Sequence, residues 1–75
     1  MTKRKANAGM AVLDVVALLS ALPSHGLGRG QVGTVVERLD EKTVLVEFSD
    51  DGRAYALAPC RQDQLLVLHY LPEAA

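Results

Sequence analysis

The sequence predicts a small all-β domain, built as a strongly bent sheet or barrel of about five short strands. Residues 43–49 (TVLVEFS) alternate strictly, with Val44, Val46 and Phe48 on one side and more polar side chains on the other. Short polar segments, DEK and DDG, separate this run from its neighbours, as turns separate the strands of a meander. Aromatic side chains are scarce and Val and Leu abundant, so the core is expected to be aliphatic.

The first 22 residues divide into a tail and an ambiguous segment. Residues 1–9 are small, polar and basic, and we interpret them as a flexible tail preceding the domain at 10–72. Residues 10–22 (MAVLDVVALLSAL) have the length and the Ala and Leu content of a helix but contain β-branched pairs that favour a strand. The residues alone leave these two structures equally open. As a strand, the segment would be apolar on both faces, which is typical of a central or interface strand.

The remaining elements follow in order along the chain. Residues 23–31 (PSHGLGRGQ) are rich in proline and glycine and predict a long turn region. We then expect these strands and connections: a strand at 32–39, a turn at 40–42, a strand at 43–49, a turn at 50–52, a strand at 53–58 that Pro59 ends, a turn or single 3₁₀ turn at 60–64 and a strand at 65–70.

Composition and charge narrow the classes of function. The chain has one cysteine, Cys60, so it forms no internal disulfide, and its two histidines lack the paired spacing of a zinc site. Residues 6–75 contain five basic and nine acidic side chains, a net charge of −4, which is unsuited to nucleic acid. Asp14 interrupts an apolar run that is too short for a membrane span. We therefore predict a cytoplasmic protein with no metal, no cofactor and no membrane contact.

The stretch GRGQVG, Gly28 to Gly33, matches the glycine spacing of a dinucleotide-binding loop. That loop needs a helix after its last glycine, whose N-terminus holds the phosphate, and here a strand pattern follows. A structural interpretation is better supported. Gly30 would allow a tight turn before the strand, and Gly33 would allow sharp curling or close backbone approach inside it.

Two resemblances extend this interpretation. The stretch RGQVGTVV, within residues 28–48, resembles the KOW motif of ribosomal and transcription-factor proteins. A broader match covers residues 11–69 and is similar to a small bacterial family called domain of unknown function 4926. It includes DVVAL at 14–18, LPSHGLGRGQVGTVV at 22–36, VEFSDDG at 46–52 and DQLLVL at 63–68. The family resemblance implies an SH3-like barrel in which Asp14 to Leu22 form the first strand, and it implies no activity.

The chain departs from the family pattern just after the DVVAL segment. Relatives tend to have polar or acidic residues after DVVAL, whereas this chain has Leu19, Ser20 and Ala21, so its first strand exposes more apolar surface. We predict a homo-oligomer contact there, formed by Val15, Ala17, Leu19 and Ala21. We assign turn or strand-start roles, without catalysis, to Pro23, His25, Gly26, Gly30, Gly33 and Gly52.

Three functional hypotheses follow, and we favour a non-enzymatic protein-interaction module that self-associates and docks onto an unidentified protein. The second is a KOW-like nucleic-acid or ribosome-associated module, which the acidic domain disfavours. The third, implied by the gene neighbourhoods of some relatives, is an antitoxin or immunity-type partner. No supported Ser-His-Asp arrangement occurs, and Cys60 is expected to be a small buried residue rather than a nucleophile.

Overall fold

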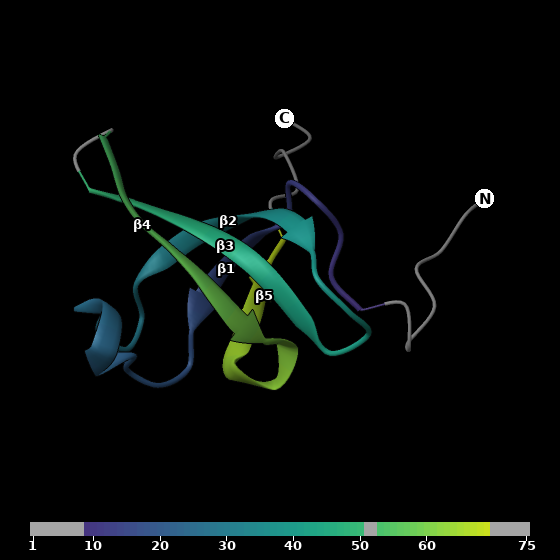
Figure 1. Cartoon of the computed structure of the whole chain (residues 1–75), viewed down its shortest axis with the longest axis horizontal. Coiled ribbons are helices and arrows are strands. Elements are labelled where there is room, and N and C mark those ends of the chain that lie inside the picture. The colour runs from purple at the N-terminus through teal and green to yellow at the C-terminus, as the bar shows by residue number, and fades with distance from the viewer. Residues whose placement is uncertain (1–8, 51–52, 70–75) are drawn as a thin grey trace, which may run out of the picture.

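The domain is a single antiparallel sheet of five short strands, seen in a computed structural model that describes residues 9–50 and 53–69 (Figure 1). The strands are β1 (Val15–Leu18), β2 (Val32–Arg38), β3 (Thr43–Asp50), β4 (Arg53–Arg61) and β5 (Leu65–Leu68). Two 3₁₀ turns, η2 (Pro23–His25) and η3 (Gln62–Gln64), precede β2 and β5. The predicted all-β class is confirmed. The predicted tail lies outside the described residues apart from Gly9, and so does Gly52.

The strand order is β4-β3-β2-β1-β5, which places the first strand in the interior of the sheet. Val15 pairs with Thr34 of β2 on one side and with Leu68 of β5 on the other. This resolves the helix-or-strand ambiguity, because two neighbouring strands satisfy the backbone of β1 on both edges. The two outermost strands are β4 and β5, and no ladder joins them within the described residues. Closure into an SH3-like barrel stays a prediction.

Two expected strand ends are wrong by three residues or more, and the strand expected at 65–70 ends earlier, at Leu68. The first strand ends at Leu18 instead of Leu22, because the chain bends at Leu19 and then closes the η2 turn through reciprocal backbone hydrogen bonds of 2.9 and 3.1 Å between Leu22 and Leu27. Pro59 does not end β4, which continues to Arg61 with Pro59 opposite Leu45. An edge strand tolerates proline because every second backbone nitrogen faces away from the neighbouring strand.

All five strands contribute to one hydrophobic core. The residues with no exposed surface include Val16, Val35, Val46 and Phe48, and Cys60 and Leu65 join the same cluster. A flat sheet would leave such side chains open on one side, so the sheet curls around its own inner face. Bulges after Val35 and after Phe48 help it to bend, because a bulge increases the local twist of a strand.

Glycines permit the tightest approaches of the backbone. A Cβ atom on Gly33 would lie 2.7 Å from Val46 Cγ1 and 2.8 Å from both the Glu47 carbonyl oxygen and Phe48 Cδ1. Only glycine therefore fits at this position, where the paired strands β2 and β3 lie so close to each other. Gly26 (φ 68°) and Gly30 (φ 87°) adopt the left-handed conformation in the turn region before β2. No helix among the described residues is long and apolar enough to cross a membrane.

Candidate functional site

The outer side of the sheet carries apolar side chains in rows that the strand register defines. One row contains Leu66, Ala17 and Val32, from β5, β1 and β2. The next row begins with Leu68 and Val15 and continues through Thr34. Cross-strand partners share a face, so these side chains form one surface opposite the core. We call this surface the apolar outer face; its members are Val15, Ala17, Leu19, Val32, Leu66 and Leu68.

This surface is partly exposed to solvent, and none of its side chains is charged or polar. Leu66 is 52% exposed, Leu19 is 49% exposed and Val32 is 46% exposed, whereas Val15 and Ala17 are half-buried between them. Single exposed apolar residues are ordinary on protein surfaces, but a contiguous group of them indicates an interaction site. The outer face is therefore the strongest candidate for a binding surface among the described residues.

Of the four residues predicted to form an oligomer contact, two lie in β1 and two lie after its end. Val15 and Ala17 occupy the centre of the apolar outer face, as strand alternation required. Leu19 and Ala21 are exposed but lie beyond the end of β1. The Leu19 backbone N–H still donates to the Gln64 carbonyl at 2.8 Å, which keeps Leu19 beside the start of β5. Whether these residues form an interface stays a prediction.

Sequence reasoning missed the contributions of β2 and β5 to this surface. Val32, Leu66 and Leu68 become neighbours of β1 only through the register of pairs that are distant in sequence. Residues 65–68 (LLVL) are apolar at every position, which was the available signal that both faces of this strand meet apolar surroundings.

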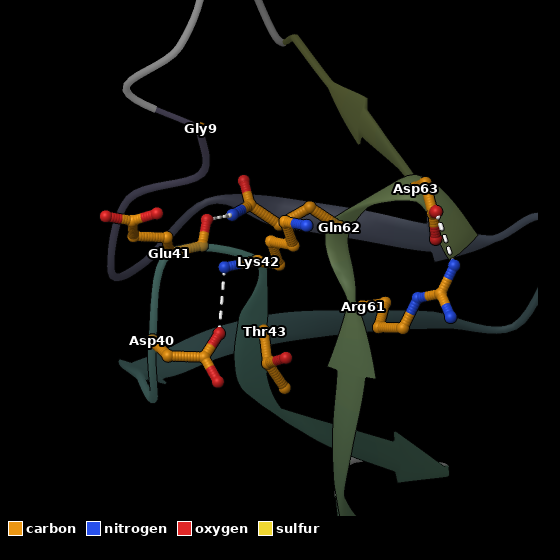
Figure 2. A pocket seen from close by; sticks show the side chains of 8 residues that line it. All are labelled: Gly9, Asp40, Glu41, Lys42, Thr43, Arg61, Gln62 and Asp63. Carbon is orange, nitrogen blue, oxygen red and sulfur yellow. Dashed lines mark hydrogen bonds and ion pairs between the residues drawn. The ribbon is translucent and has the colours of Figure 1, made fainter.

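A second candidate is a polar depression at the end of the sheet where the β2–β3 turn meets η3 (Figure 2). Gln62 organises it. Its side-chain oxygen accepts from the Met10 N–H at 2.7 Å, its side-chain nitrogen donates to the Glu41 carbonyl at 2.8 Å, and its backbone N–H donates to the Lys42 carbonyl at 2.8 Å. Gln62 thereby ties the N-terminal segment to the turn and to η3. The depression is best explained as a structural junction.

Three of the five charged side chains that line this depression, those of Asp40, Arg61 and Asp63, have hydrogen-bond partners at the surface. Asp40 accepts from the Lys42 backbone N–H at 2.8 Å, and this hydrogen bond lowers the pKa of the Asp40 carboxyl. Arg61 and Asp63 form an ion pair of 2.7 Å, visible in Figure 2, whose hydrogen bond lowers the pKa of Asp63 and raises that of Arg61. Both partners are about two-thirds exposed, 66% each, so the pair contributes little to stability.

Of the other residues singled out from the sequence, Pro23 and His25 share the η2 turn, whereas Cys60 lies in the core. His25 is exposed in η2, with its Nδ1 at 3.2 Å from Ser24 Oγ, and Pro23 begins the same turn. Cys60 is buried, as predicted, and burial raises the pKa of its thiol, which makes it a poor nucleophile. No group of three His, Cys, Asp or Glu side chains suited to a metal ion occurs in the part of the chain that the structure describes.

Comparison with known protein families shows to which family the chain belongs. The family model described as "Domain of unknown function (DUF4926)" matches residues 12–67, which is most of the chain and all of the sheet except Leu68. The chain belongs to the DUF4926 family. The match confirms the family resemblance seen in the motifs. No curated protein and no solved structure matches the chain.

Proposed function

We propose that this DUF4926 domain is a non-enzymatic protein-interaction module that self-associates through its apolar outer face. The single observation that supports this proposal is the uncharged row of Leu66, Ala17 and Val32 across β5, β1 and β2, in which Leu66 and Val32 are about half exposed. Burying such surface against a partner is favourable, with roughly 25 cal/mol gained for each Å² removed from water.

The distribution of charge favours a protein partner over nucleic acid. The outer face presents no basic side chain, and the described arginine beside the polar depression, Arg61, is already paired with Asp63. Nucleic-acid binding depends on basic groups that neutralise phosphates, so an uncharged face on an acidic domain is suited to apolar contact instead.

Sedimentation velocity over a range of concentrations tests the proposal. We expect the wild-type chain to show a concentration-dependent increase in sedimentation coefficient. The variant Leu66→Lys should remain monomeric, because a charge in the middle of the contact would be buried without a partner.

Leu57→Lys is the matched control. Leu57 is 53% exposed and Leu66 is 52% exposed, and both lie on the outer side of an edge strand. Leu57, however, belongs to β4 and is paired with the charged Glu47 of β3. The control should associate as the wild type does. A wild-type chain that is monomeric at every concentration would contradict the proposal, and so would equal losses in the two variants.

A further inference from the structure

The apolar outer face is not level, because its central residue is its smallest. Ala17 is paired with Leu66 on one side and with Val32 on the other. Val15 lies two residues earlier on the same side of β1. Ala17 is half-buried among these larger side chains, whereas Leu66 is 52% exposed. The face thus presents a projecting leucine directly beside a shallow hole.

We infer that a second copy of the chain covers this face in a two-fold dimer in which Leu66 of each copy packs onto Ala17 of the other. This inference rests on the proposed function and specifies its partner and its register. A two-fold contact requires a surface that is complementary to itself, so that each residue pair occurs twice. Leu66 and Ala17 are direct cross-strand neighbours, and an axis parallel to the strands and midway between β5 and β1 exchanges their positions.

The available area sets the strength of this dimer. Six side chains, partly exposed, offer roughly a few hundred Å² on each copy, below the about 800 Å² per partner of a standard stable interface. The dimer is therefore weak and reversible, and it leaves the face available to a competing partner at low concentration. The whole chain has a net charge of only −1, so charge repulsion between two copies weakens the dimer only slightly, and salt screens it.

An exchange of projection and hole tests the register. Leu66→Ala removes the projection and Ala17→Leu fills the hole, so each variant should weaken the dimer about tenfold in sedimentation equilibrium. In the double variant, the leucine at position 17 projects and the alanine at position 66 leaves the hole, so the two shapes are complementary again. This variant should dimerise within about threefold of the wild type, a coupling that only residues in contact produce.

Controls separate this register from other modes of association. Leu57→Ala, at an equally exposed position on β4, should leave the dimer unchanged. A double variant that is no better than the singles overturns the inference while leaving the proposed self-association intact. Edge pairing through β5 is another mode of association. It would be indicated if Leu66→Ala, Ala17→Leu and the double variant all still dimerise and the dimer protects the backbone amides of residues 65–68 from exchange. That result also overturns the inference. A wild-type chain that never associates defeats the proposed function itself.

A measurement on the unmodified chain avoids dependence on variants that fold poorly. In a mixture of isotope-labelled and unlabelled copies, filtered NMR spectra should show contacts between the Ala17 methyl of one copy and the Leu66 methyls of the other. The filter removes the contact within one chain, where the same two residues are cross-strand neighbours. Absence of the intermolecular signal under conditions where the dimer is populated would rule out this register.

Discussion

The outer sides of β1 and β3 differ although their inner sides are alike. Both strands lie inside the sheet and bury alternate side chains completely, such as Val16 on β1 and Phe48 on β3. Outside, β1 presents Val15 and Ala17, whereas β3 presents the exposed carboxylate of Glu47. The inner pattern is needed for folding on both strands. The outer pattern is free to vary, and its apolar character on β1 is the basis of the proposed self-association.

The largest expected effect is a loss of stability when a buried side chain on the inner side of β3 is truncated. Phe48→Ala should lower the free energy of unfolding by about 3–5 kcal/mol, because it leaves a cavity under a fully buried ring. Glu47→Ala, one residue earlier and exposed, should change it by about 0.5 kcal/mol or less. Urea titrations followed by circular dichroism measure both, and similar losses in the two variants would contradict the inner–outer distinction.

A smaller effect is expected from overpacking at Gly33, where β2 pairs closely with β3. Gly33→Ala introduces a Cβ that meets Val46, Phe48 and a backbone oxygen, so it should cost about 1–3 kcal/mol of stability. Gly28→Ala is the control, because a Cβ added at Gly28 would have no neighbouring atom within 4 Å. The same urea titration should leave the control near the wild type, and a stable Gly33→Ala variant would show that the two strands can move apart.

The features that the sequence predicted correctly depend on local patterns, as the two faces of β3 show. Strict alternation was sufficient to bury Phe48 and to expose Glu47. The polar segment before Leu65 predicted a turn or 3₁₀ turn at 60–64, and the structure has one at 62–64, because Cys60 and Arg61 still belong to β4. These features depend on neighbouring residues only. Composition and local pattern were also sufficient to place Cys60 inside.

Features that depend on distant pairing could not be predicted in this way. Residues 10–22 had equal helix and strand character, and only pairing with both β2 and β5 makes 15–18 a strand. Pro59 was expected to end its strand, because nothing local shows that β4 is at an edge. The role of Gln62 depends on Met10, which is 52 positions away. The same limitation hid Leu66 from the predicted interface.

A substitution on the outer side tests whether the contrast between β1 and β3 governs association. Glu47→Val should extend the apolar surface from Thr34 across β3 to Leu57, because Glu47 pairs with both residues. We expect association to strengthen by about tenfold with almost no change in stability. Glu41→Val in the exposed β2–β3 turn is the control and should associate as the wild type does. Sedimentation velocity distinguishes the variants, and unchanged association of Glu47→Val would count against the outer face as the contact.

The smallest effect concerns the charged end of the sheet. The pKa of Asp40 and that of Asp63 are lowered in the folded chain, so ionisation favours folding above their ordinary value of 3.8, and this contribution is lost as pH falls through the lowered folded values. Asp40→Asn and Asp63→Asn should each slightly flatten the acid branch of a stability–pH curve. Thermal melts from neutral to acidic pH measure this, and a variant with a steeper acid branch would contradict the assigned direction.

The position of β1 between β2 and β5 has a consequence for synthesis of the chain. β1 is made first and β5 last, yet they are adjacent strands, with Val16 opposite Val67. While the ribosome is still extending the chain, one edge of β1 has no native partner and its apolar side chains lack part of their cover. Pairings between residues so far apart form slowly, and exposed strand edges invite pairing with other nascent chains. The domain can complete its sheet only after Leu65–Leu68 have left the ribosome.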